Sequence, residues 1–196
     1  YKRQMKKRND VAAAFFGDGA AEEGAIHESL NFAALKKLPV VFFCENNLYA
    51  VEAAGSRTKA NPRIADIARP WGIASMRIDG NDVCAVYAAA AQMVVRARRG
   101  EGPGFIEAMT YRWLEHVGPH EASVKGYRPR GEIERWKKRC PVASFGRFLR
   151  RRGLLDAAVE AEMRRVIRRR IAAAWRRMKA SPFPILYKKE GAVCVR

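Results

Sequence analysis

Apolar and polar positions in the first half of the chain come in blocks that predict strands separated by helices. Residues 11–16 form a short apolar run bounded by glycine, the pattern of a buried parallel strand. Residues 24–37 then carry apolar side chains at the spacing of a helix, namely Ile26, Leu30, Ala33 and Ala34. Pro39 ends that helix, and the apolar run 40–44 predicts a second buried strand. These residues are therefore expected to form a strand–helix–strand unit.

The following segment predicts a loop, a short helix and a third strand. Residues 50–59 are polar and rich in alanine, and we expect a loop there. Asn61 is expected to cap a short helix that Pro70 and Gly72 would end. Residues 73–78 form the next apolar run, which is followed by a turn rich in Asp, Gly and Asn, as at the end of a strand.

A second long helix and a fourth strand complete the alternation. Asp82 is expected to cap a helix over residues 83–99. The predicted inward-facing stripe of that helix consists of Val83, Val86, Tyr87, Ala90 and Val94. Residues 105–111 predict a fourth strand after a glycine-containing turn. Because strands alternate with helices, the expected fold class is α/β, a parallel sheet flanked by helices with right-handed crossovers.

The second half of the chain predicts a long loop followed by helices. Residues 113–130 have no clear periodicity and contain two glycines and two prolines; loops of this length are usually functional or disordered. Helical patterns cover residues 133–139, 142–152 and 155–178. One face of the last helix carries Val159, Met163, Val166, Ile167, Ile171, Ala174 and Met178. We expect this face to pack on the sheet or on a partner subunit rather than on a membrane surface. Residues 185–196 carry no motif that we can interpret.

Composition and charge narrow the class of protein. The 196 residues include 38 Lys and Arg against 20 Asp and Glu, a net charge of +18, which is a common property of nucleic-acid-binding proteins. Residues 131–180 hold 16 of these basic side chains against 5 acidic ones, on helical sequence with few aromatics. We interpret this charge as a solvated helix face, or as a docking surface for an acidic partner, and expect no nucleic acid. No segment is apolar for long enough to span a bilayer, and the four scattered cysteines argue against a zinc site or a disulfide scaffold.

Two polar motifs follow the first two predicted strands. Gly17-Asp18-Gly19-Ala20 comes after the first, and Glu45-Asn46-Asn47-Leu48-Tyr49 comes after the second. In an open parallel sheet, ligands bind at the carboxyl ends of the strands, where both motifs would lie. Glycine allows backbone N–H groups to approach phosphate oxygens, while an Asp, an Asn and a loop carbonyl are suitable ligands for Mg²⁺. The alternative is that both motifs are ordinary turns of a strand–helix–strand unit.

These motifs resemble the thiamine diphosphate signature, Gly-Asp-Gly followed later by Asn-Asn. The sequence of residues 17–50 is similar to that of the alpha subunit of the decarboxylating component of 2-oxo-acid dehydrogenases. This group includes the pyruvate, branched-chain and acetoin enzymes. The resemblance implies that Asp18, Asn47 and the carbonyl of Tyr49 bind Mg²⁺. It also implies that the first motif, Gly17, Gly19 and Ala20 included, contacts the cofactor thiamine diphosphate. The sheet would hold the diphosphate half of that cofactor.

The resemblance extends to the loop after the fourth predicted strand, where the family carries Tyr-Arg-Tyr-His-Gly-His. Residues 111–116 match this motif, so His116 takes the place of the second histidine, which is implied in handling the substrate and the intermediate. Leu114 replaces the first histidine, and Val117 replaces the serine that mammalian relatives phosphorylate. A catalytic role is therefore expected for His116. His120 and His27 are expected to be surface or packed histidines.

The resemblance also implies a function, that of an oxidoreductase subunit that decarboxylates a 2-oxo acid and transfers the acyl group to a lipoyl arm. Its expected partners are a beta subunit, in an alpha2-beta2 heterotetramer, and a lipoyl-bearing dihydrolipoyl acyltransferase. Residues 1–130 would form the cofactor-binding α/β domain, and residues 131–196 a helical extension. The alternatives left open are another thiamine diphosphate enzyme, such as a transketolase-type protein, or a basic nucleic-acid-binding protein.

Family alpha subunits carry a long region before the part that this chain matches. The chain starts with Tyr1 and a basic run, so we expect it to be a fragment that is inactive alone. The expected location of the parent protein is the bacterial cytoplasm or, in a eukaryote, the mitochondrial matrix.

Overall fold

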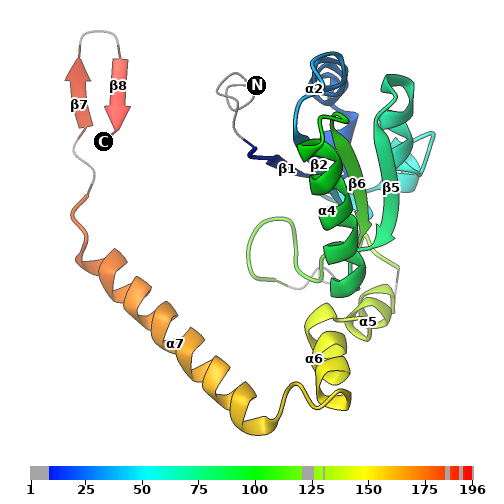
Figure 1. The fold of residues 1–196 in the computed structure, drawn as a ribbon. Helices are drawn as coiled ribbons and strands as arrows, with labels where there is room; N and C mark the ends of the chain where they lie inside the picture. Colours follow the sequence, from blue (N-terminus) through cyan, green and yellow to red (C-terminus); the bar gives the residue numbers. More distant parts are fainter. Residues whose placement is uncertain (1–8, 121–125, 130, 184–185, 190–191, 196) are drawn as a thin grey trace. The chain divides into compact units, whose positions relative to one another are not determined.

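The computed structural model describes residues 9–120, 126–129, 131–183, 186–189 and 192–195 (Figure 1). The chain divides into two compact units, the first ending at Phe145 and the second beginning at Gly146. We predicted a division after residue 130. The first unit extends further because Ile133 and Trp136 pack against Tyr49 and Tyr111.

A four-stranded parallel sheet forms the centre of the first unit. Its strands lie in the order β1 (Ala12–Gly17), β2 (Val40–Asn46), β6 (Gly104–Met109) and β5 (Ala74–Asp79). Every neighbouring pair is parallel. The carboxyl ends of the strands are level with one another, since Gly17 pairs with Glu45 and Asn46 pairs with Met109. The predicted α/β fold is thus confirmed, and the carboxyl ends of β1 and β2 meet at one edge of the sheet.

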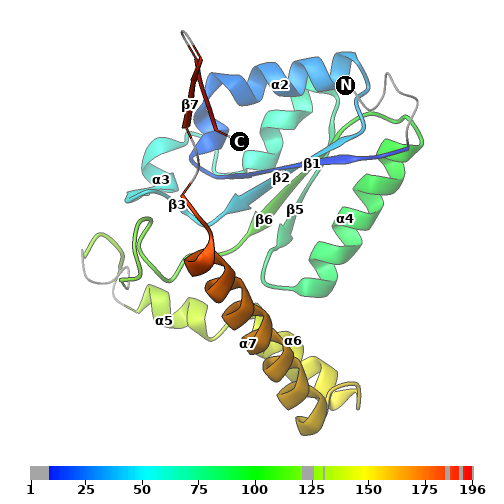
Figure 2. The same ribbon diagram turned by 90° about the vertical axis from the view of Figure 1, so that its left-hand side faces the viewer.

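Helices cover both faces of this sheet (Figure 2). On one face, α2 (Gly24–Leu35) and the 3₁₀ helix η2 (Ile64–Trp71) pack against strands β2 and β6. The other face is covered by α4 (Val83–Arg98). The alternation of β2 explains the two cores, because Phe42 and Cys44 point to the first face and Val41 to the second.

Helix α4 is capped as predicted, and its predicted inward stripe is right only in part, since Ala90 and Val94 pack against the core. The Asp82 carboxylate accepts hydrogen bonds from the N–H groups of Cys84 and Ala85, at 2.9 and 3.2 Å. The buried side chains are Ala89, Met93 and Ala97, whereas Val83 is exposed and Tyr87 is 76% exposed. The helix is thus turned so that the small Ala89 and Ala97 and the larger Met93 face the sheet, and Val83 and Tyr87 of the predicted stripe face away from it.

Two local predictions between β2 and β5 are also wrong. Residues 50–59 are not a plain loop, since β3 (Tyr49–Ala50) pairs with β4 (Ala53–Ala54) and α3 (Gly55–Thr58) follows. The turn of this small hairpin contains Val51 with a positive φ of 56°, which the sequence does not suggest.

Asn61 is not the cap of η2, because that helix starts only at Ile64. The Asn61 side chain instead accepts a hydrogen bond from the N–H of Arg63 at 2.8 Å, in a turn that precedes the helix. Pro70 lies inside the last turn, and Gly72, in the left-handed region, ends the helix as predicted.

The remaining elements follow β6. A loop leads to α5 (Glu132–Lys137) and α6 (Pro141–Arg151), and the second unit contains α7 (Ala157–Ala180). No residue of α7 is buried, so the described part of the chain does not cover its apolar face; packing on a partner subunit stays a prediction. The hairpin of β7 (Leu186–Lys189) and β8 (Ala192–Val195) was not predicted. No helix in the described ranges is both long and apolar enough to cross a membrane.

Candidate functional site

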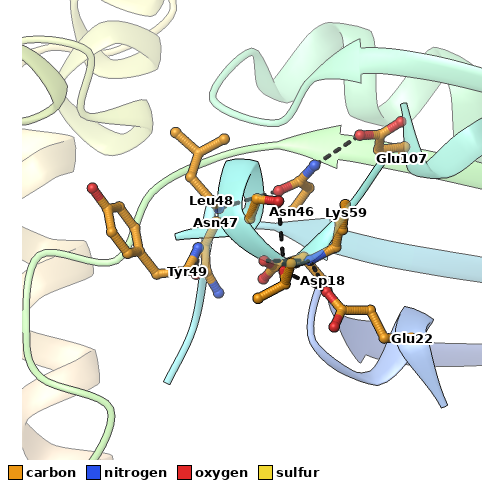
Figure 3. Close-up of polar contacts among 10 residues, drawn as sticks. Asp18, Glu22, Asn46, Asn47, Leu48, Tyr49, Lys59 and Glu107 are labelled. Atoms are coloured by element: carbon orange, nitrogen blue, oxygen red, sulfur yellow. Dashed lines mark hydrogen bonds and ion pairs between the residues drawn. The ribbon is translucent and has the colours of Figure 1, made fainter. Parts of the chain in front are cut away.

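The two polar motifs come together at the carboxyl ends of β1 and β2, as predicted. Asp18 directly follows β1, while Asn46 ends β2 and Asn47 follows it. Figure 3 shows these three side chains gathered with those of Lys59 and Glu22. The arrangement brings two carboxylates, two amide side chains and one ammonium group together at this edge of the sheet.

Asp18 is a buried carboxylate at the centre of the site. Its side chain is almost entirely buried, and the residue is 1% exposed. Burial raises the pKa of Asp18, while the Lys59 ammonium and backbone hydrogen bonds of Asp18 and Asn47 act in the opposite direction. The oxygen Oδ2 has no hydrogen-bond partner within the described residues and lies 3.7 Å from Lys59 Nζ. A buried carboxylate oxygen in this state is suited to accept a cation.

The Asn46–Tyr49 turn is held by two side-chain hydrogen bonds. The N–H of Leu48 donates to Asn46 Oδ1 at 3.1 Å, and the N–H of Tyr49 donates to Asn47 Oδ1 at 3.2 Å. These bonds support Leu48 in a left-handed conformation with φ of 73°, which a leucine adopts only when its surroundings impose it. The turn therefore has one specified backbone geometry.

The glycines of the first motif play different parts. A Cβ added at Gly19 would lie 2.9 Å from Ala50 Cβ, so glycine is needed for the close approach of the two motifs. A Cβ added at Gly17 would meet nothing within 4 Å, which leaves open space beside the motif. Ala20 is exposed and begins the short helix η1 (Ala20–Glu22), so α2 starts four residues later than the motif itself.

Lys59 is a residue that sequence reasoning missed. Its Nζ pairs with the carboxylates of both Glu22 and Asp18, and its side chain is only 9% exposed. Thr58 Oγ1 donates to the same Glu22 carboxylate at 2.7 Å. The sequence offered no signal, because Lys59 lies in the segment that we predicted to be a polar loop.

Glu107 is a second missed residue. It lies in the middle of β6 and is 0% exposed. Its carboxylate accepts hydrogen bonds from Asn46 Nδ2 at 2.8 Å and from the N–H of Ala65 at 2.9 Å. The guanidinium Nε of Arg77 lies 3.5 Å away. An acidic residue inside the apolar run of a buried strand was a signal that could have indicated it.

An aromatic cluster joins the turn to the start of α5. The hydroxyl groups of Tyr49 and Tyr111 both donate to Glu132 Oε2, at 2.7 and 3.1 Å. The buried guanidinium of Arg128 lies 4.8 and 4.7 Å from the centroids of these two rings. Burial raises the pKa of Tyr111 to about 12. The cluster fixes the side chain of Tyr49, whose backbone carbonyl is the predicted metal ligand.

The histidines lie outside these contacts. His116 and His120 are exposed on the loop after β6, and the N–H of the buried Glu115 donates to the carbonyl of His120 at 2.9 Å. His27 is exposed on α2. The catalytic role of His116 stays a prediction.

The residues present fit a magnesium ion whose coordination is completed by a bound phosphate group. No group of three or more His, Cys, Asp or Glu side chains within the described ranges could hold a metal alone. The two motifs offer Oδ2 of Asp18, which accepts no hydrogen bond from the described residues, together with the amide oxygen of Asn47 and backbone carbonyls. Magnesium takes about six oxygens and commonly obtains several from phosphates and water, so this donor set suits a Mg²⁺–diphosphate.

Comparison with known proteins shows the family to which the sequence is related. Residues 1–186 match the family model described as "Dehydrogenase E1 component". The chain is 41% identical over 162 residues to the 3-methyl-2-oxobutanoate dehydrogenase subunit alpha of Mycobacterium tuberculosis, covering 82% of this chain and 43% of that protein.

Two further relatives carry similar names. The human mitochondrial 2-oxoisovalerate dehydrogenase subunit alpha is 36% identical over 185 residues, covering 94% of this chain and 41% of that protein. The pyruvate dehydrogenase E1 component subunit alpha of Staphylococcus aureus is 38% identical over 161 residues, covering 81% and 43%. The chain thus spans less than half the length of each of these relatives.

Proposed function

The chain belongs to the dehydrogenase E1 component family, and we propose that it is the cofactor-binding part of an alpha subunit that acts in the oxidative decarboxylation of a 2-oxo acid. The observation that carries the proposal is the buried Oδ2 of Asp18, which accepts no hydrogen bond from the described residues, beside the Asn46–Tyr49 turn. The family names of the relatives favour this reading over a transketolase-type enzyme or a nucleic-acid-binding protein.

The proposed cofactor is thiamine diphosphate with Mg²⁺. When bound, this cofactor would supply the carbanion chemistry for decarboxylating a 2-oxo acid and for transferring the acyl group to a lipoyl arm. Asp18, Asn47 and the carbonyl of Tyr49 would hold the metal ion. Gly19 keeps the first motif close to Ala50, and the open space at Gly17 admits the phosphate groups.

The proposed partners are a beta subunit, in an alpha2-beta2 heterotetramer, and a lipoyl-bearing acyltransferase. The word "alpha" in the names of the relatives supports the first of these. The relatives are named after branched-chain 2-oxo acids and after pyruvate, so the proposed substrate class is a 2-oxo acid within that range. His116 is the proposed catalytic residue, while Leu114 and Val117 set its loop apart from the family motif.

Replacing Asp18 by asparagine tests the proposal. Asp18→Asn removes the only carboxylate among the proposed metal ligands, and should weaken Mg²⁺-dependent thiamine diphosphate binding more than about tenfold. Isothermal titration of the cofactor into the full-length alpha subunit assembled with beta measures this affinity.

Asp82→Asn is the matched control, since asparagine caps a helix as well as aspartate does and Asp82 caps α4. It should bind the cofactor like the wild type. Equal affinities for the Asp18→Asn and wild-type enzymes would refute the assignment of this site.

A further inference from the structure

The buried carboxylate of Glu107 connects four elements at the candidate site. It projects from β6, accepts from Asn46 at the end of β2 and from the N–H of Ala65 in η2, and lies beside Arg77 of β5. A fully buried carboxylate is destabilising unless charges and hydrogen bonds offset its loss of hydration. Here Asn46, the Ala65 N–H and Arg77 provide these interactions. Glu107 therefore accepts at both of its oxygens.

Asn46 is the next link, and both ends of its amide are used. Nδ2 donates to Glu107 Oε1 at 2.8 Å, while Oδ1 accepts from the N–H of Leu48 at 3.1 Å. The hydrogen bonds thus run in one direction, from the Leu48 N–H to Asn46 and from Asn46 to Glu107. Figure 3 shows Asn46 between Glu107 and the turn.

We infer that Glu107 is a positioning residue for the metal-binding turn, acting through Asn46. By accepting from Nδ2, Glu107 fixes the amide orientation that leaves Oδ1 facing the Leu48 N–H. That bond supports the left-handed conformation of Leu48, which in turn places Asn47 and the carbonyl of Tyr49. This inference rests on the proposed function, since it concerns the turn that would bind Mg²⁺.

The direction of the hydrogen bonds allows a sharp test. In Glu107→Gln, one oxygen must still accept from the Ala65 N–H, so the new NH₂ group faces the NH₂ group of Asn46. Turning the Asn46 amide over only moves the conflict, because its NH₂ group would then face the Leu48 N–H. In Asn46→Asp, two carboxylates would face each other in the core.

The double variant Asn46→Asp/Glu107→Gln should restore the arrangement. The aspartate accepts from both the Leu48 N–H and the glutamine NH₂, and the glutamine oxygen accepts from the Ala65 N–H. The total charge of the pair is unchanged, and Arg77 loses its ion pair with Oε1, which the Arg77→Gln control also removes. A general loss of packing would not produce such a reciprocal rescue.

The experiment titrates Mg²⁺ at a fixed thiamine diphosphate concentration into full-length alpha assembled with beta, and follows binding by isothermal titration. Melting temperatures are measured separately without cofactor. Each single variant should weaken the apparent Mg²⁺ affinity more than about tenfold, and the double variant should return to within about threefold of wild type. Arg77→Gln is the control, because it removes the ion pair of the same carboxylate and leaves the Asn46 bond in place. It should lower the melting temperature but not the Mg²⁺ affinity.

The outcomes separate the inference from the proposed function. Wild-type protein that binds no cofactor would overturn both. Wild-type binding with an unchanged Glu107→Gln affinity would overturn the inference alone, and so would losses that simply add in the double variant. If Glu107→Gln does not fold, a folded double variant with near wild-type Mg²⁺ affinity still supports the inference. A double variant that also fails to fold overturns it.

Discussion

Lys59 and Asp18 bring opposite charges together at a position that is almost closed to water. Burial alone raises the pKa of Asp18, and the nearby ammonium of Lys59 partly restores the charged form. A metal ion at Asp18 Oδ2 would share this carboxylate with an ammonium group. Glu22, which also pairs with Lys59, can hold that ammonium to the side when the cation is bound.

His116 is the residue whose role most needs a direct test. If its side chain stabilises charge on the intermediate, His116→Ala should leave cofactor affinity unchanged, because the proposed ligands of the metal ion and diphosphate, Asp18 and Asn47, are untouched. Turnover with a lipoyl acceptor should fall by roughly 10²–10⁴-fold, the usual effect of losing a positioned proton-transfer or charge-stabilising group. The assay uses full-length alpha and beta subunits with several 2-oxo acids.

His120→Ala is the matched control on the same loop, and it should lose far less activity. Both histidines are exposed in this chain, so their folding contributions are small and similar. Wild-type turnover of the His116 variant on every accepted substrate would show that His116 is an ordinary surface histidine.

The sequence indicated some site residues and missed others. The missed residues have partners whose position depends on tertiary structure and not on a local sequence pattern. Asp18 and Asn47 flank predicted strands, so their meeting followed from the parallel arrangement alone. Glu107 bonds to Asn46, which is 61 positions away, and the side chain of Lys59 pairs with Asp18 across a segment whose hairpin was not predicted. Such contacts depend on the register of neighbouring strands and on a turn with a positive φ at Val51, and neither has a local pattern.

At the scale of elements, the packing of α4 on the sheet depends on a glycine, Gly104 of β6, which has no side chain to occupy the space between them. A Cβ added at Gly104 of β6 would lie 2.6 Å from Met93 Sδ and 3.0 Å from Met93 Cβ. Gly104 therefore creates the room that Met93 fills. The sequence predicted α4 and β6 correctly as elements, but the choice of the larger apolar residues for the inward stripe included the exposed Val83 and Tyr87 and missed Met93.

Gly104→Ala should destabilise the protein by about 1–3 kcal/mol, because the added methyl group forces Met93 and α4 to move. Urea denaturation of the full-length alpha subunit measures the change in the free energy of unfolding. Gly146→Ala, the same substitution within helix α6, should instead be neutral or stabilising by up to about 1 kcal/mol. Equal effects of the two substitutions would mean that Met93 does not pack as described.

At the scale of the whole molecule, this chain leaves an apolar surface and a large positive charge without an internal explanation. The apolar side chains of α7 include Met163, Ile167 and Ile171, each more than half exposed. Basic residues such as Arg168 and Arg169 are also exposed on this helix. An exposed apolar face of this length is typical of a protein–protein interface, and the alpha subunit names of the relatives make a beta subunit the expected partner.

The last prediction therefore concerns assembly. Ile167→Asp should leave the melting temperature of the isolated alpha subunit nearly unchanged, since Ile167 is 55% exposed in the chain itself. It should weaken association with beta more than about tenfold, because the interface would then bury an unpaired charge. Sedimentation velocity of mixed full-length subunits measures this association, with Arg169→Gln, an exposed residue two positions along α7, as the control that should assemble normally. Wild-type assembly of Ile167→Asp would leave the apolar face of α7 solvated in the complex. A large drop in the melting temperature of the isolated subunit would instead place that face against the rest of the alpha chain.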